Sequence, residues 1–251
     1  MATLLTHEIE RLKKDLLALS ALVEERLYAA ARAVEARDRE LAQQVIDGDD
    51  DIDRAEVELE EACLKVLALH QPVAGDLRFV VMALKIDNDL ERVGDMAVNI
   101  AKRARHLAKR PAITAPLDIH AMTDKVWRQL KKSLDAFVRS DPSAAREVLR
   151  EDESTDDLYK SGRRVLIATM REHPESVDAL VDYLWVLRSC ERIGDHATNI
   201  AEDVIYLVEG AIARHKKLAA EPPEIGAGES PPETQTSPRQ AHEKTPDSGC
   251  G

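Results

Sequence analysis

The stretch Glu91-Arg92-Val93-Gly94-Asp95 decides how this chain is organised, because it occurs twice. The second copy reads Glu191-Arg192-Ile193-Gly194-Asp195, and both copies continue with Ala, Asn, Ile and Ala at matching offsets. Every shared position is displaced by 191 − 91 = 100 residues. A repeat at a fixed spacing indicates that one structural unit is present twice.

The composition and the hydrophobic pattern both favour long helices. Only 3% of the 251 residues are aromatic, while 44% are hydrophobic and 33% are charged. Apolar residues recur at alternating spacings of three and four, which is the heptad pattern of packed helices. These seams are Leu5, Ile9, Leu12, Leu16, Leu19 and Val23, continuing through Leu27, Ala30 and Val34; Ile52, Ala55, Leu59, Ala62, Val66 and Leu69; Phe79 through Leu107; and Ala179 through Leu207.

Capping and breaking residues predict where the helices begin and end. We expect Gly48 to kink a helix spanning about residues 39–70, with Gln71-Pro72 as its stop signal. Asp76 and Asp118 are the expected N-caps of the next two helices, and Asp141-Pro142 has the N-cap and N1-proline form that opens another. That helix should end near His173-Pro174.

The predicted fold is all-α, with two tandem antiparallel three-helix bundles related by the internal repeat. Short connections between helices favour antiparallel neighbours. We expect the first bundle over residues 1–110, the second over 117–218, and a disordered tail rich in Pro and Glu over 219–251.

Charge and cysteine content exclude several functional classes. A net charge of −12 and few aromatic residues argue against nucleic-acid binding, which needs cationic and stacking side chains. Three scattered cysteines without a CxxC spacing indicate neither a disulfide framework nor a thiolate zinc site. We therefore expect a cytoplasmic protein, and since no apolar run is long enough to cross a bilayer, any membrane association should be peripheral.

Each repeat carries a ridge of carboxylates beside its hydrophobic seam. Glu91 and Asp95 are four residues apart, as are Glu191 and Asp195, and like charges at this spacing repel on a helix. One interpretation is that arginines three residues earlier, such as Arg188 before Glu191, neutralise an ordinary solvated surface. Another is that a cation binds there. Glycine at 94 and 194 costs about 1 kcal/mol in a helix, which indicates close packing or open space beside the carboxylates.

The expected hairpins bring a second pair of carboxylates to each ridge. If the first hairpin folds back near residue 73, Asp53 is level with residue 93 and Asp49 with residue 97, on either side of Asp95. If the second folds back near residue 174, Asp152 and Asp156 are level with Glu191 and Asp195. Glu153 and Asp157 have the same spacing, so either pair of the second bundle satisfies the pattern.

Four carboxylates on adjacent helices form an all-oxygen environment suited to hard or borderline cations such as Mg²⁺, Mn²⁺ or Fe. Catalytic roles fit the sequence less well. No nucleophile with a positioned base, phosphate-binding glycine loop or HExxH motif is present, so we expect no enzyme. The alternative is a metal-storing or carboxylate-bridged metalloenzyme, although neither ridge supplies the Glu-x-x-His pairs of di-iron bundles.

These residues together resemble the PhoU family, the accessory regulators of bacterial phosphate-specific transport. The resemblance covers about residues 6–217 and rests on the following stretches: Cys63-Leu64, Gln71-Pro72, Ala74, Asp76-Leu77-Arg78, and both copies of the Glu-Arg-x-Gly-Asp repeat. It implies tandem three-helix bundles and a homodimer. It also implies metal binding through E/D-x-x-x-D motifs, which fall on Asp49, Asp53, Glu91, Asp95, Asp152, Asp156, Glu191 and Asp195.

The resemblance also implies a function and partners. We expect a cytoplasmic scaffold that contacts the ATPase subunit of a phosphate ABC transporter and a sensor histidine kinase. It would repress phosphate-starvation signalling when phosphate is plentiful. Divalent or iron cations (Mg, Mn, Fe or Zn) are the candidate cofactors.

Overall fold

The computed structural model describes residues 2–111, 113 and 117–210, and every regular element in that part of the chain is helical. The elements are α1 (Ala2–Ala36), α2 (Arg39–Asp47), α3 (Asp49–His70), α4 (Ala74–Leu107), α5 (Ile119–Arg139), α6 (Pro142–Glu172), the 3₁₀ turn η1 (Pro174–Ser176) and α7 (Val177–Glu209). The predicted all-α fold is confirmed. The expected disordered tail, residues 219–251, and the last part of the second bundle, residues 211–218, lie outside the described residues.

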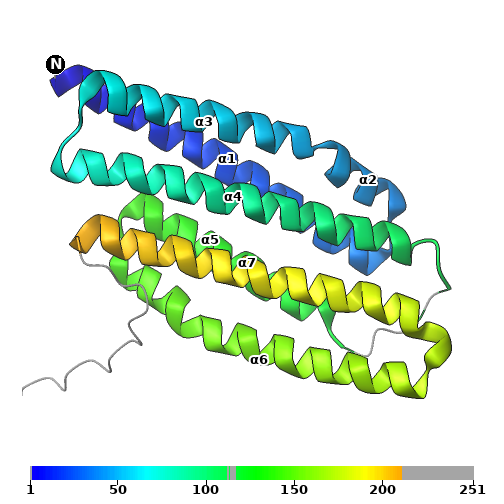
Figure 1. The fold of residues 1–251 in the computed structure, drawn as a ribbon. Coiled ribbons are helices and arrows are strands. Elements are labelled where there is room, and N and C mark those ends of the chain that lie inside the picture. The colour runs from blue at the N-terminus through cyan, green and yellow to red at the C-terminus, as the bar shows by residue number, and fades with distance from the viewer. Residues whose placement is uncertain (1, 112, 114–116, 211–251) are drawn as a thin grey trace, which may run out of the picture. The chain divides into compact units, whose positions relative to one another are not determined.

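The two bundles pack along their length. Helices α1 to α4 form the first bundle and α5 to α7 form the second (Figure 1). Helix α4 contacts α7, and α1 contacts α5, so the repeated helices meet at the centre of the molecule. Helices α3 and α6 lie on opposite sides of this central pair (Figure 1). One hydrophobic core runs through both bundles.

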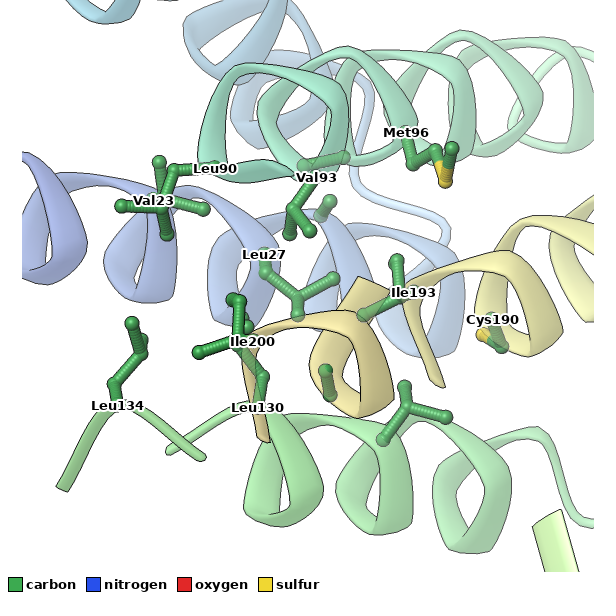
Figure 2. Close-up of a cluster of buried hydrophobic side chains, with 14 of the residues drawn as sticks. Val23, Leu27, Leu90, Val93, Met96, Leu130, Leu134, Cys190, Ile193 and Ile200 are labelled. Carbon is green, nitrogen blue, oxygen red and sulfur yellow. The ribbon is translucent and has the colours of Figure 1, made fainter. Parts of the chain in front are cut away.

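The heptad seams fill that core. Residues of α1, α4, α5 and α7 meet in a cluster that includes Val23, Leu90, Leu130 and Ile193 (Figure 2). All four of these residues are 0% exposed, as expected of close-packed interior residues. Leu69 is the exception among the seam positions of α3, since it is 76% exposed in the last turn of the helix. Its predicted burial was wrong, while Cys63 is buried in the same helix.

Two of the three expected N-caps are present. The Asp118 side chain accepts a hydrogen bond from the Ala121 N–H, and Asp141 accepts from the N–H groups of residues 143 and 144. Asp76 is not an N-cap, because α4 already begins at Ala74 after the extended residue Val73. Asp76 instead lies in the first turn, where a carboxylate interacts favourably with the helix dipole.

Gly48 separates two helices rather than kinking one. Helix α2 ends at Asp47 and α3 begins at Asp49. The guanidinium group of Arg26 occupies the space where a Cβ at position 48 would lie. Nη2 of Arg26 also forms an ion pair with Oδ2 of Asp51 at 3.5 Å. A side chain at position 48 would therefore require the end of the Arg26 side chain to move.

Candidate functional site: twin carboxylate clusters and the seam between them

The first carboxylate cluster lies where α3 meets α4. An alanine Cβ at position 94 would lie 3.1 Å from Cδ1 of Ile52, so α3 and α4 approach closely at this level. The register places Asp49 and Asp53 of α3 opposite Glu91 and Asp95 of α4. Burial, followed by the negative charges of Asp53 and Asp95, raises the pKa of Asp49. The structure therefore gathers these four carboxylates.

Glu91 belongs to the α4 side of the same cluster. It is half-buried, and its pKa is raised first by burial and then by Asp95. Arg92 acts in the opposite direction, and its Nε donates to Oδ1 of Asn88 at 3.1 Å. Asp95 is exposed to solvent. The first cluster is thus open on one side and partly desolvated on the other.

The second cluster repeats this arrangement between α6 and α7. Burial raises the pKa of Asp195, and the charges of Asp152 and Asp156 raise it further. Burial and then the charge of Asp195 raise the pKa of Glu191, which forms an ion pair with Arg188 at 2.6 Å. The arginine interpretation therefore holds for Glu191, but only for one of its two oxygens.

The structure decides which acidic pair of α6 faces α7. Asp152 and Asp156 are half-buried, and Oδ1 of Asp152 accepts a hydrogen bond from Nε2 of Gln129 at 3.1 Å. Glu153 and Asp157 are exposed, and the Asp157 side chain is 73% accessible. The alternative pair therefore points to solvent and takes no part in the cluster.

Both clusters offer only carboxylate oxygens, which are the ligands that hard cations prefer. All eight predicted residues are carboxylates, and Oε2 of Glu191 is buried without a hydrogen-bond partner among the described residues. A buried carboxylate oxygen without a hydrogen-bond partner is costly, and a cation would offset that cost. Within residues 2–111, 113 and 117–210, however, no three His, Cys, Asp or Glu side chains already stand in a metal-binding arrangement. An ion would have to draw the carboxylates together.

Asp87 is the most deeply buried acid next to the first cluster. It is 2% exposed, and its Oδ1 has no hydrogen-bond partner among the described residues. Burial, followed by the charges of Glu56, Glu60 and Glu91, raises the pKa of Asp87 to about 8. A carboxyl with this pKa is mainly protonated at pH 7. Burial also raises the pKa of the nearby Cys63 thiol to about 12.

Polar residues also join the two bundles along the seam between α4 and α7. Nδ1 of His196 lies 2.8 Å from Oδ1 of Asp89, and Asn199 donates to the same oxygen at 3.3 Å. One step further along the seam, Lys85 forms an ion pair with Asp203, which is 2% exposed. These contacts link the helices that carry the two repeats.

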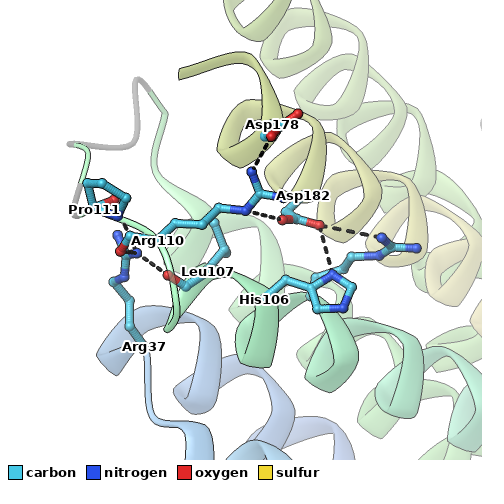
Figure 3. Close-up of polar contacts among 8 residues, drawn as sticks. Arg37, His106, Leu107, Arg110, Pro111, Asp178 and Asp182 are labelled. Carbon is cyan, nitrogen blue, oxygen red and sulfur yellow. Dashed lines mark hydrogen bonds and ion pairs between the residues drawn. The ribbon is translucent and has the colours of Figure 1, made fainter. Parts of the chain in front are cut away.

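The other end of the seam is organised around Asp182. Its carboxylate contacts Arg103 at 3.4 Å, His106 at 3.5 Å and Nε of Arg110 at 3.5 Å (Figure 3). Arg37, at the end of α1, donates to the carbonyl oxygens of residues 107, 110 and 111 (Figure 3). The start of α7, the end of α4 and the end of α1 are thereby held together.

The seam was not predicted, although part of it continues the acidic ridge. Residues spaced by four drift by about 40° per step around a helix, because four residues turn through about 400°. Glu191 and Asp195 therefore face α6, whereas Asn199 and Asp203 have rotated far enough to face α4. The sequence signal was the repeat itself: Asp89 corresponds to Ser189 and His196 to Met96, so this polar pair breaks the repeat at buried positions.

Together, the fold and the two clusters define an all-helical protein whose repeated halves each present carboxylates on paired helices. Comparison with known proteins gives the family. A family model for the PhoU domain matches residues 16–104 and again residues 119–204. The chain belongs to the PhoU family.

Individual relatives support this assignment over most of the chain. A protein of Pseudomonas putida named "Phosphate-specific transport system accessory protein PhoU homolog" is 40% identical over 218 residues, which cover 85% of each chain. A homologue of the same name from Aquifex aeolicus is 39% identical over 214 residues, or 85% of this chain and 97% of its own.

Solved structures show the same fold. The crystal structure of PhoU from Pseudomonas aeruginosa matches with a TM-score of 0.79 and 39% identity, covering 82% of this chain and 99% of that one. The phosphate transport system regulatory protein PhoU from Streptococcus pneumoniae matches with a TM-score of 0.77 and 31% identity, covering 83% of this chain and 98% of that one.

Among the described residues, no helix is both long and apolar enough to span a membrane.

Proposed function

We propose that this protein is an accessory regulator of phosphate transport that represses phosphate-starvation signalling when phosphate is plentiful. It would act in the cytoplasm as a scaffold, contacting the ATPase subunit of a phosphate ABC transporter and a sensor histidine kinase. The observation that carries the proposal is the PhoU family match to both halves of the helical body. Relatives named as accessory or regulatory proteins of phosphate transport give further support.

A complementation experiment tests this role. The chain is expressed in a bacterium that lacks its own PhoU protein and carries a reporter under a promoter induced by phosphate starvation. We expect the chain to restore repression in phosphate-rich medium and to co-purify with the transporter ATPase and the kinase. A reporter that stays fully induced, although the protein accumulates in folded form, would contradict the role.

We further propose that cations bind the twin clusters and fix the packing of α3 on α4 and of α6 on α7. The raised pKa values of Asp49 and Asp195 support the proposal, because burial and, after it, the negative charges of neighbouring carboxylates disfavour the ionised forms. An ion would neutralise that repulsion. Mg²⁺, Mn²⁺, Fe and Zn remain the candidates, since ligand type alone does not separate them.

Ligand-induced stabilisation provides the test of the cation proposal. An ion that binds only the folded state raises the free energy of unfolding by about 2.7 kcal/mol at a hundredfold excess over its Kd. We expect added Mn²⁺ or Mg²⁺ to raise the Tm of the wild type. The variant Glu91→Gln/Asp95→Asn/Glu191→Gln/Asp195→Asn should show no such rise. Equal shifts in both proteins would place the ions elsewhere.

The proposed role is regulatory rather than enzymatic. The metalloenzyme alternative draws no support from the relatives, whose names describe accessory and regulatory proteins of phosphate transport. His196, which directly follows Asp195, is engaged with Asp89 across the seam rather than with the carboxylate cluster. The protein is further proposed to form a homodimer, which sedimentation equilibrium would detect as twice the mass of 27.9 kDa.

A further inference from the structure

A basic hollow interrupts the acidic surface of the second bundle. It has a volume of about 860 Å³ and lies over α6 beside the start of α5. Its cationic lining residues are Lys125, Lys160, Arg163 and Arg164, against the single acidic residue Asp157. The chain as a whole carries a charge of −12, so this concentration of positive charge is a local feature.

The first bundle has the opposite charge at the corresponding place. Ile52 and Thr155 contact the repeated glycines Gly94 and Gly194, so α3 and α6 correspond at an offset of 155 − 52 = 103 residues. Arg163 and Arg164 therefore correspond to Glu60 and Glu61, and all four are exposed. The basic hollow is thus specific to the second half of the repeat and is not a shared requirement of the fold.

The two arginines are available to a partner. Neither Arg163 nor Arg164 forms an ion pair in the part of the chain that the structure describes, whereas Lys160 contacts Asp156 at 3.3 Å. The arginines stand beside the hydroxyl group of Ser161 and the half-exposed aliphatic side chain of Leu158. Guanidinium groups pair with carboxylates through two parallel hydrogen bonds.

We propose that this basic hollow is a docking site for an acidic peptide segment of a partner protein. The site is a shallow groove along α6, and its positive charge is complementary to the carboxylates of such a segment. The mixed lining suits a peptide as well, since Arg163 and Arg164 pair with its carboxylates while Leu158 packs against its apolar side chains. The inference deepens the proposed regulatory role by giving the chemistry of a partner, and it rests on that role only for the partner's identity.

The test measures binding of a fluorescein-labelled oligoglutamate peptide to the purified full chain by fluorescence anisotropy. The variant Arg163→Glu/Arg164→Glu gives α6 the residues that α3 has at the corresponding positions. The control variant Arg54→Glu/Lys65→Glu makes the same change of charge on α3, where both side chains are exposed. Circular dichroism shows whether each variant keeps its helices, and Arg163→Gln/Arg164→Gln serves if charge reversal disturbs folding.

We expect the wild type and the control to bind the peptide with similar affinity. The hollow variant should bind at least tenfold more weakly. Absence of peptide binding to the wild type, or equal loss in both variants, would overturn the proposal. Binding to phosphatidylglycerol vesicles but not to the peptide would overturn it in favour of a membrane surface. These assays use purified protein, so their failure leaves the complementation test of the regulatory role unaffected.

Discussion

Nδ1 of His196 lies 2.8 Å from Oδ1 of Asp89, at the centre of the seam that joins the two repeats. Both residues are only 9% exposed. At the repeat-related positions the chain has Met96 and Ser189, which are also buried and make no such pair among the described residues. The seam therefore offers two solutions to the same packing problem, one polar and one largely apolar.

A double-mutant cycle measures how much the polar pair contributes. His196→Met or Asp89→Ser alone leaves the other member buried without its main partner, which should lower the free energy of unfolding by about 1 to 3 kcal/mol. The double variant installs the residues found at the repeat-related positions and should recover part of that loss. Urea unfolding followed by circular dichroism provides the values. Strict additivity of the two single changes would show that the pair is not coupled.

Asp182 should matter more to stability than Asp178, although both contact Arg110. The Asp182 side chain is 4% exposed and contacts two arginines and a histidine, while the Asp178 side chain is 80% exposed. Asp182→Ala should cost about 2 kcal/mol or more, because it removes a buried partner of charged groups. Asp178→Ala should cost about 0 to 1 kcal/mol, as for other surface ion pairs. Equal costs in thermal unfolding would refute this ranking.

The raised pKa of Asp87, about 8, predicts a specific dependence of stability on pH. Between about pH 4 and pH 8 the folded protein keeps the Asp87 proton while the unfolded chain releases it. Stability therefore falls as pH rises, by up to about 1.4 kcal/mol per unit, and this contribution levels off above about pH 8. Asp87→Asn removes the dependence. The free energy of unfolding of the variant, measured in EDTA and relative to that of the wild type, should therefore rise from pH 4 to pH 8.

Glu56→Gln provides the control for the Asp87 experiment. Glu56 faces Asp87 from α3, and its charge contributes to the raised pKa of Asp87. Removing that charge should shift the pH range of the effect to lower values without abolishing it. A constant difference between Asp87→Asn and the wild type at every pH would instead show that Asp87 has an ordinary pKa.

Much of the fold was predictable because the information is local. The seam of α4 repeats every three or four residues from Phe79 to Leu107, and all its members are buried. The cap at Asp141 follows from the Asp-Pro sequence. The approach of Ile52 to Gly94 follows from chain direction and helix rise. The approach of Asp49 and Asp53 to the α4 ridge follows from the same geometry.

The seam between the bundles was not predictable in this way. Asp89 and His196 are separated by 107 residues, and their contact depends on how one bundle packs on the other. Leu69 was placed in the core because its spacing is right, yet it lies in the last turn of α3, where its side chain remains 76% exposed. Periodicity gives the face of a helix but not where its neighbours end.

Metal content measured by ICP-MS on the untagged protein is the most direct test of the twin clusters. The protein is purified in a buffer with near-physiological Mg²⁺ and Mn²⁺, beside the variant Glu91→Gln/Asp95→Asn/Glu191→Gln/Asp195→Asn. We predict about one or more ions per cluster in the wild type and none in the variant, whose helices circular dichroism should show to be intact. A wild type that holds no metal, or a variant that holds as much, would contradict the assignment.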